Sequence, residues 1–210
     1  MTSTFNPLWN SHYDFSLPGN LEEIARQQGL DASGIEELPP YNQGGGDTIQ
    51  SPWGTNKTLD AGLYHAGLAK DFLAERFINP ERLLEMVSAP LEFCQKDIVV
   101  NPAHMLSLQR HRGRQECWAV AEGALTVILD GKIYELMQGQ NIYIPRGSAH
   151  CMINRSSAPV RVIELQSGIC REGDNVRLLD FSGRPVYPLT SETEFVSAQL
   201  YASIQRDIQG

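Results

Sequence analysis

The chain has 210 residues, of which 41% are hydrophobic and 20% are charged, and its formal net charge is -8 at pH 7. These values predict a globular protein with one sizeable domain and extensions, and they exclude wholesale disorder. Because phosphate backbones require a basic face, an acidic chain of this kind is expected to bind neither nucleic acid nor membranes.

The first residues show no basic start followed by an apolar stretch, so no signal peptide is expected. A run of about 18 apolar residues, as a membrane span needs, does not occur. The four cysteines form no CxxC pair. Together these features predict a cytoplasmic protein with reduced thiols.

Residues 1–92 predict an N-terminal extension of loops and short helices. A helix is expected near residues 21–28, where Asn20 can cap its start. The glycine run at residues 44–46 is interpreted as a loop, because no Lys-Ser/Thr pair or helix follows it as a phosphate cradle would require. Residues 60–92 are expected to be helical, since apolar side chains recur near one face.

Residues 93–190 predict a β-barrel domain. Short β-rich segments recur between turn signals, and they read KDIVV, MLSLQR, ECWAVA, LTVIL, KIYEL, NIYIP, HCMIN and VRVIELQ. The pair Asp130-Gly131, between LTVIL and KIYEL, is the strongest hairpin signal in the chain. Short strands with tight turns predict a closed barrel or jelly roll, because such folds hide their sheet edges.

Residues 191–210 predict a C-terminal helix. Ser191 and Glu194 form the pattern of a capping box at its start. An apolar stripe at a spacing of four follows, made of Val196, Leu200, Ile204 and Ile208. The stripe is expected to pack either on the barrel or on a second subunit, and the sequence leaves both open.

A dense polar cluster interrupts the apolar strands before the middle of the barrel domain. Gln109 and His111 share parity along a strand, so their side chains point to one face. Gly113 lets the chain turn, after which Glu116 shares its face with Trp118 and is expected to point into the barrel. An amide, an imidazole and a carboxylate would then lie together among apolar groups.

His150 adds a second imidazole, at the start of the strand that follows the turn Pro145-Arg146-Gly147. A single strand histidine is more often an ordinary core or surface residue, but two ordered clusters favour a metal site. Imidazole nitrogen with carboxylate or amide oxygen suits borderline divalent ions such as Mn, Fe, Co, Ni or Zn. Cys117 and Cys151 neighbour these groups but have the opposite parity, so both are interpreted as packing residues.

The spacing of these residues resembles two known motifs. Gln109-x-His111-x4-Glu116-x6-Gly123 resembles the first cupin motif, with Gln in the place usually held by a first His. Gly139-x5-Pro145-x-Gly147-x2-His150-x3-Asn154 matches the second cupin motif. This resemblance implies a mainly β, cupin-type barrel in which Gln109, His111, Glu116 and His150 bind a divalent metal ion.

A narrower resemblance is to the cupin of type II mannose-6-phosphate isomerases, including those fused to mannose-1-phosphate guanylyltransferases. It rests on SLQ at 107–109, Arg114, Trp118, YIP at 143–145, IELQSG at 163–168, Arg177, Asp180 and GR at 183–184. Pro52-Trp53-Gly54 also resembles the Pro-Trp-Gly that opens such domains. The chain departs from the family at Gly113 and Cys117, within a run that is typically rich in histidine.

The resemblance implies a metal-dependent isomerase that interconverts an aldose and a ketose, of the mannose-6-phosphate/fructose-6-phosphate type, through a metal-stabilised enediolate. Glu164 is the candidate base, although a structural pairing with Arg161 or Arg177 stays open. Arg114, at the family's arginine position, is the first choice for the sugar phosphate. Further basic side chains expected at the substrate are Arg112, Lys96, Arg177 and Arg184, with surface salt bridges as the alternative for the last two.

Other functions stay open from the sequence. His111, Glu116 and His150 also make the two-His, one-carboxylate set of iron oxygenases, so an Fe(II) cupin dioxygenase is the alternative enzyme. The altered residues around Arg112 and Gly113 leave room for a sugar-binding cupin without catalysis. Since cupins commonly pair sheet to sheet, a homodimer is expected.

Overall fold

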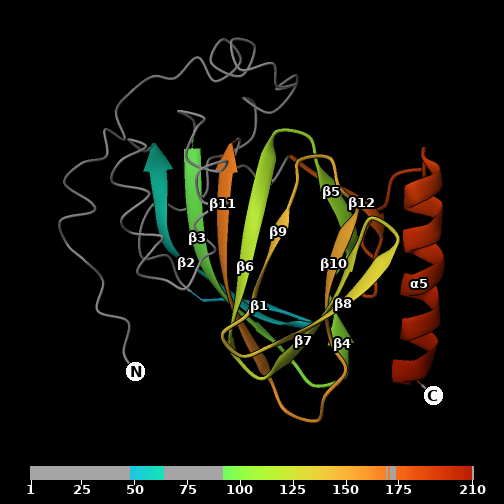
Figure 1. Ribbon diagram of the computed structural model, residues 1–210, viewed down its shortest axis with the longest axis horizontal. Coiled ribbons are helices and arrows are strands. Elements are labelled where there is room, and N and C mark those ends of the chain that lie inside the picture. Colours follow the sequence, from blue (N-terminus) through green and yellow to red (C-terminus); the bar gives the residue numbers. More distant parts are fainter. Residues whose placement is uncertain (1–47, 64–91, 169, 171–173, 210) are drawn as a thin grey trace.

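The computed structural model describes residues 48–63, 92–168, 170 and 174–209 (Figure 1). The helix expected near residues 21–28, the glycine run at 44–46 and residues 64–91 lie outside the described residues. Among the described residues, no helix is long and apolar enough to cross a membrane.

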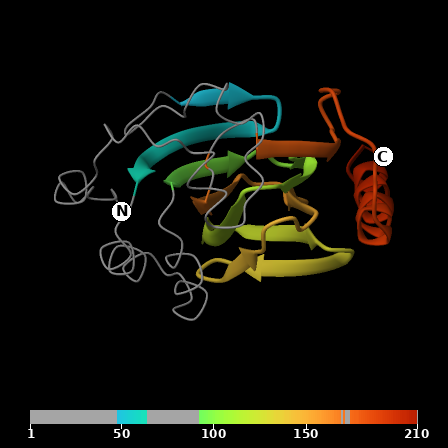
Figure 2. The same cartoon turned by 90° about the horizontal axis from the view of Figure 1, so that it is seen from above.

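The described strands form two antiparallel sheets, which face each other as the walls of a barrel (Figures 1 and 2). The first sheet has the order β1-β2-β3-β11-β6-β9, and its strands are β1 (Ile49–Ser51), β2 (Gly54–Leu63), β3 (Glu92–Val100), β11 (Val160–Gly168), β6 (Arg114–Glu122) and β9 (Asn141–Ile144). The second has the order β12-β5-β10-β7-β8, with β4 paired to β10. Its strands are β12 (Asn175–Leu179), β5 (Leu108–His111), β10 (His150–Asn154), β7 (Ala124–Leu129), β8 (Lys132–Met137) and β4 (His104–Met105). The expected mainly β jelly roll is therefore confirmed.

The hairpin between β7 and β8 forms where the sequence predicted it. Leu129 pairs with Lys132, and the two residues between them have φ angles of 46° at Asp130 and 75° at Gly131. Two successive left-handed residues are what a type I′ turn needs, and Asp-Gly supplies them at low steric cost.

Apolar side chains from both sheets fill the barrel interior. The buried members of this core are Trp53, Ile98, Val100, Trp118, Val120, Leu125, Val127, Ile144, Met152, Val160 and Val162. Glu116 has the parity of Trp118 and Val120 and is itself fully buried, so the inward direction expected for it is confirmed.

Helix α5 (Glu192–Gln209) packs on the outer face of the second sheet. Tyr201 and Ile204 are buried in a second apolar cluster with residues of β4, β5, β7, β10 and β12, and Leu200 packs against that cluster. Most of the predicted stripe therefore contacts the barrel of the same chain, although Val196 stays 39% exposed.

The capping box at the start of α5 is also confirmed. Ser191 N–H donates to Glu194 Oε2 at 3.3 Å, and Glu194 N–H donates to Ser191 Oγ at 3.2 Å. These reciprocal bonds satisfy backbone donors that the first helical turn leaves without a partner.

Strand β2 corrects the expectation for residues 60–63. These residues are not helical but lie in β2, which pairs with β3 from Gly54 opposite Val100 to Leu63 opposite Glu92. Pairing with β2 satisfies the backbone N–H and C=O groups along one edge of β3. The apolar spacing of residues 60–63 gives no information about this partner strand, so the helix prediction was wrong there. Strands β1 and β2 are thus part of the barrel sheet, although they lie in the predicted N-terminal extension. A domain boundary between residues 92 and 93 stays a prediction.

Candidate metal centre and adjoining cavity

Two contacts bring the two motifs side by side in the barrel. Gly147, with a φ of 81°, donates its N–H to the carbonyl of His111 at 2.8 Å. His150 lies opposite Gln109 where β10 pairs with β5. Glu116 comes from β6 in the other sheet, so the expected ligands reach the interior from both walls.

His111, Glu116 and His150 form a buried cluster, with one ligand atom from each lying within 4.8 Å of the others. His111 Nε2 is 3.0 Å from Glu116 Oε1, and His150 Nε2 is 3.6 Å from Glu116 Oε2. None of the three side chains is more than 1% exposed. The structure thus brings together three of the four expected ligands.

Gln109, the fourth expected ligand, is not part of the His111, Glu116 and His150 cluster as described. It lines the cavity, and its Oε1 accepts a hydrogen bond from Ser107 Oγ at 2.9 Å. Its role as a fourth ligand stays a prediction.

The protonation states of the cluster suit a cation. His150 Nδ1 lies 2.8 Å from the carbonyl of Ser148, and because a carbonyl can only accept, Nδ1 carries the proton and Nε2 keeps its lone pair. Burial and the charge of Arg114 lower the pKa of His111 to about 3. Burial raises the pKa of Glu116, but His111 and Arg114 outweigh it and hold that pKa well below its usual range. The cluster therefore consists of a carboxylate between neutral imidazoles.

These residues fit a divalent metal ion. His150 Nε2 is buried and has no hydrogen-bond partner among the described residues, although a buried polar atom normally has one. Two imidazoles and a carboxylate are donors that Mn, Fe, Co, Ni and Zn accept. A cation beside Glu116 would engage the unpaired nitrogen and the carboxylate together.

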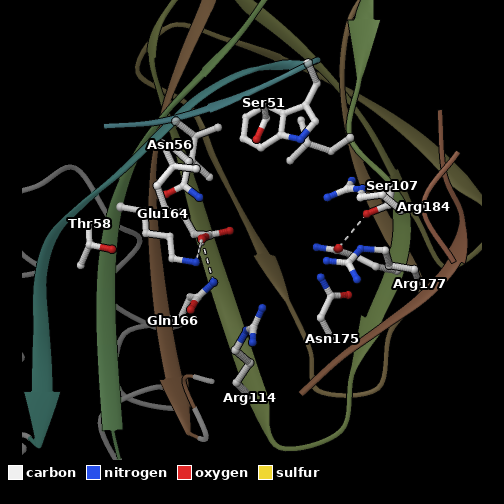
Figure 3. Close-up of a pocket in the computed structure, with 16 residues that line it drawn as sticks. Ser51, Asn56, Thr58, Ser107, Arg114, Glu164, Gln166, Asn175, Arg177 and Arg184 are labelled. Atoms are coloured by element: carbon white, nitrogen blue, oxygen red, sulfur yellow. Dashed lines mark hydrogen bonds and ion pairs between the residues drawn. The ribbon is translucent and has the colours of Figure 1, made fainter. Parts of the chain in front are cut away.

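A cavity of about 360 Å³ adjoins the cluster. Figure 3 shows Glu164 and Gln166 on one wall, Asn175 and Arg177 on the opposite wall, and Arg114 between them at one end. Its described lining includes four basic side chains and a single carboxyl, namely Lys96, Arg114, Arg177, Arg184 and Glu164. Despite the acidic net charge of the chain, this cavity suits an anionic ligand.

Two side chains join Glu164 to the carboxylate of Glu116. Trp118 Nε1 donates to Glu116 Oε2 and to Glu164 Oε1, both at 3.1 Å. Gln166 Nε2 donates to Glu116 Oε1 at 3.1 Å and to Glu164 Oε2 at 2.7 Å. The carboxyl at the cavity is thereby fixed beside the cluster. The sequence did not predict the two bonds donated by Trp118, because their acceptors lie on different strands, β6 and β11.

The environment of Glu164 is unusual for a carboxyl. Burial and the nearby negative charge of Glu116 raise the pKa of Glu164 to about 8, although Lys96 acts in the opposite direction. The ammonium of Lys96 lies 4.0 Å from Glu164 Oε2. A proton on this carboxyl is therefore held near neutral pH, as proton transfer requires.

The alternative pairing of Glu164 with Arg161 is wrong. Arg161 instead donates to Asp97 at 2.9 and 2.6 Å. Arg177 lies across the cavity from Glu164 (Figure 3). Two of the partners of Glu164, Gln166 and Lys96, line the cavity, and the third, Trp118, also donates to Glu116. These contacts strengthen the candidacy of Glu164 as a functional group.

The remaining predicted basic residues fall into different positions. Arg184 lines the cavity and also pairs with Asp180, with Nη2 at 2.7 Å from Oδ1, so the salt bridge left open for it does form. Arg112 is half-buried and is not among the described lining residues. Its contact with a substrate stays a prediction.

The cysteines beside the ligands behave as packing residues. Cys151 belongs to the outer apolar cluster under α5. Burial raises the pKa of Cys117 to about 12, and that of Cys151 also lies well above its ordinary value. Both thiols therefore stay protonated and unreactive.

Asp174 is a site residue that the sequence did not reveal. Its Oδ1 accepts the backbone N–H groups of Arg112 and Gly113 at 3.0 and 2.8 Å. Its Oδ2 is 4.0 Å from Arg114 Nη1. Because its firm partners are backbone amides far away in the chain, no local motif could have indicated this role.

Comparisons with known proteins agree with this geometry. Residues 78–180 match the family described as mannose-6-phosphate isomerase C-terminal. A mannose-1-phosphate guanylyltransferase of Escherichia coli K12 is 42% identical over 90 residues, which cover 42% of this chain and 19% of that protein. The alginate biosynthesis protein AlgA of Pseudomonas aeruginosa is 41% identical over 97 residues, covering 46% of this chain and 20% of AlgA.

A solved structure, a sugar phosphate isomerase from a cupin superfamily of Silicibacter pomeroyi, is 26% identical with a TM-score of 0.34, over 36% of this chain and 50% of that one. The chain spans about a fifth of the length of the two relatives from Escherichia coli and Pseudomonas aeruginosa. On the motifs, the barrel and the family match, residues 78–180 belong to the cupin domain of type II mannose-6-phosphate isomerases.

Proposed function

We propose that the chain is a metal-dependent isomerase that interconverts an aldose and a ketose, acting on a sugar phosphate of the mannose-6-phosphate/fructose-6-phosphate type. The observation that carries the proposal is the linkage of the His111, Glu116 and His150 cluster to Glu164 at a cavity rich in basic side chains. The family match over residues 78–180 supports the choice of sugar.

His111, Glu116 and His150 would hold the divalent ion, with Gln109 as a fourth group. Bound there, the ion would act as a Lewis acid on the oxygens at C1 and C2 of the sugar. The neutral imidazoles and the ionised carboxylate already have the charge states that such binding requires.

Glu164 would carry the proton between the two carbons. Its carboxylate accepts the proton from C2 and returns it to C1, while Trp118 and Gln166 hold its two oxygens in place. A pKa of about 8 favours both halves of this transfer near neutral pH. Lys96, 4.0 Å away, offsets the charge of the ionised form.

Arg177 and Arg184 support a phosphate subsite on the wall opposite Glu164. Guanidinium groups match phosphate oxygens in geometry and charge. The Asp180 pair holds Arg184 in position, so less side-chain freedom is lost on binding. We infer that this wall, rather than Arg114, contacts the phosphate, because Arg114 is 3% exposed and its guanidinium lies between two carboxyls, at 2.9 Å from Glu116 and 4.0 Å from Asp174.

Turnover of mannose 6-phosphate to fructose 6-phosphate, measured before and after chelation, tests the proposal. We expect activity to disappear with the chelator and to return with one of the candidate ions. His111→Ala and Glu116→Ala should abolish both metal uptake and turnover while the circular dichroism spectrum persists. Free mannose is the control substrate, and it should react poorly without its phosphate.

Two other results would replace the proposed function. Oxygen consumption by the Fe(II)-loaded protein with a thiol or an aromatic diol would identify a dioxygenase. Tight binding of the sugar phosphate by the metal-loaded protein with no turnover would identify a sugar-binding cupin. The homodimer stays a prediction, which sedimentation velocity measures.

A further inference from the structure

Arg114 lies between the buried cluster and the cavity. Its Nε donates to Glu116 Oε1 at 2.9 Å, and its Nη2 is 3.2 Å from His111 Nε2. The side chain is 3% exposed and lines the cavity, whereas His111, Glu116 and His150 are not among the described lining residues. The guanidinium thus lies between the cavity and the buried pair of His111 and Glu116.

This position conflicts with a bound metal ion. His111 Nε2 is 3.2 Å from Arg114 Nη2, which can only donate, and 3.0 Å from Glu116 Oε1, which can only accept when ionised. In either tautomer the lone pair of this nitrogen is therefore not free, because it accepts from Arg114 or is replaced by a proton donated to Glu116. A divalent ion ligated by the same nitrogen and by Glu116 would need that lone pair. It would also lie close to a second positive charge, which the low-dielectric interior does not tolerate. Metal binding therefore requires the guanidinium to move.

Asp174 offers a second position for the guanidinium. Its side chain is 0% exposed, and two backbone N–H groups hold Oδ1. Its Oδ2 is buried without a hydrogen-bond partner among the described residues and lies 4.0 Å from Arg114 Nη1. An unsatisfied buried acceptor is costly. Because two backbone N–H groups hold the carboxyl of Asp174 in place, Arg114 is the residue that would move to bring its Nη1 within hydrogen-bond distance of Oδ2.

We propose that Arg114 has two positions that control access to the metal centre. Without an ion it neutralises Glu116, and when a divalent ion binds, its guanidinium transfers to Oδ2 of Asp174 and the cluster opens toward the cavity. The proposal rests on the metal site of the proposed function. Asp174 is then a positioning residue for Arg114, not a metal ligand.

A double-mutant cycle on the full chain tests the transfer, with Co²⁺ as the probe at pH 7.5. The dissociation constant is measured by calorimetry and by the visible absorption of the bound ion, in wild type, Arg114→Met, Asp174→Asn and the double variant. Methionine keeps an apolar stem without donors or charge, and asparagine keeps an oxygen for the backbone amides. Asp97→Asn, which breaks the Arg161 pair, is the control for loss of a carboxylate.

We expect Arg114→Met to tighten Co²⁺ binding and Asp174→Asn to weaken it about tenfold, since the displaced guanidinium then has no carboxylate to receive it. In the Arg114→Met background, Asp174→Asn should change the dissociation constant less than about twofold, and Asp97→Asn should leave it unchanged.

Equal weakening by Asp174→Asn in both backgrounds would overturn the transfer, because Asp174 would then act only as a distant charge. Equal Co²⁺ affinity in wild type and Arg114→Met would overturn it too. In either case the metal site of the proposed function stands. Failure of all four proteins to bind Co²⁺ would overturn both.

Discussion

The pKa values of two buried carboxyls in this barrel, Glu116 and Glu164, are shifted in opposite directions. The pKa of Glu116 lies well below its usual range because His111 and Arg114 outweigh the effect of burial. Burial and the charge of Glu116 raise the pKa of Glu164 to about 8. When neighbouring environments push two carboxyls apart in this way, one is suited to stay ionised and the other to exchange a proton.

Glu164→Gln tests the second of these roles. The amide cannot accept the proton from C2, so we expect kcat to fall by roughly 10²- to 10⁴-fold. Metal content and the melting temperature should change little, because Glu164 is not among the expected ligands. Glu122→Gln, at an exposed carboxyl that pairs with Arg161, is the control and should retain wild-type turnover. A fully active Glu164→Gln variant would assign the proton transfer to another group.

Asp174 should make the stability of the metal-free protein depend on pH. Burial raises the pKa of Asp174 to about 6, above the ordinary value of 3.8. Between these values the folded state binds more protons than the unfolded state, so this group lowers the free energy of unfolding as pH rises from about 4 to 6. Asp174→Asn lacks this group, and its stability relative to wild type should therefore increase over that range, by roughly 2 to 3 kcal/mol.

Urea unfolding at several pH values measures this difference. Asp180→Asn is a useful comparison, since bonds from Arg184 and Ser182 outweigh burial and lower the pKa of Asp180. The sign for that variant should be reversed and its pH window should be lower. Its stability relative to wild type should fall as pH rises toward the ordinary pKa of 3.8 and should stay nearly constant above it. A difference between Asp174→Asn and wild type that is constant with pH would show that the carboxyl of Asp174 titrates normally.

At the level of elements, helix α5 depends on the buried carboxylate at its start. Glu194 accepts from the backbone N–H of Thr190 and Ser191, and Arg110 Nε donates to Glu194 Oε1 at 2.8 Å. We expect Glu194→Ala to lower the free energy of unfolding by about 2 kcal/mol, as the cap is lost and Arg110 loses its partner. Glu192→Ala, at an exposed position of the same turn, should cost less than about 0.5 kcal/mol. Equal effects of the two changes in denaturant unfolding would contradict this account.

The elements could be predicted from the sequence where their cause is local. Strands β5–β11 follow alternating apolar residues and turn signals, and the Asp130-Gly131 hairpin follows from backbone sterics alone. β2 and β12 (Asn175–Leu179) were not predicted, because each is defined by its pairing with a strand distant in the chain. A local sequence pattern cannot indicate which distant strand will pair with it.

The candidate site divides in the same way. Motif spacing and strand parity were enough to expect His111, Glu116 and His150 together, since each lies on a regular strand whose facing can be counted. Asp174 and the double donation by Trp118 could not be predicted, because both depend on how the two sheets and a later connection meet.

At the scale of the whole molecule, the N-terminal hairpin completes both the barrel and its cavity. Ser51, Trp53, Asn56 and Thr58 line the cavity, and Asn101 N–H donates to the carbonyl of Trp53 at 2.8 Å. A Cβ atom on Gly54, which has a φ of 143°, would lie 1.9 Å from the carbonyl oxygen of Val99. Only glycine allows this close approach, so the Pro-Trp-Gly segment, although distant in sequence from the metal motifs, is built into the same barrel.

Trp53→Ala tests whether this hairpin supports the fold and the cavity together. Trp53 is 6% exposed and belongs to the interior core while it also lines the cavity. We expect a loss of about 3 to 5 kcal/mol in the free energy of unfolding, as for other buried aromatic truncations, and a raised KM for the sugar phosphate. Trp53→Phe should recover most of the stability, because it restores most of the apolar volume. A Trp53→Ala variant with wild-type stability would mean that strands β1 and β2 are not anchored through this side chain, since a core residue of this size cannot be removed without cost when its strand stays in place.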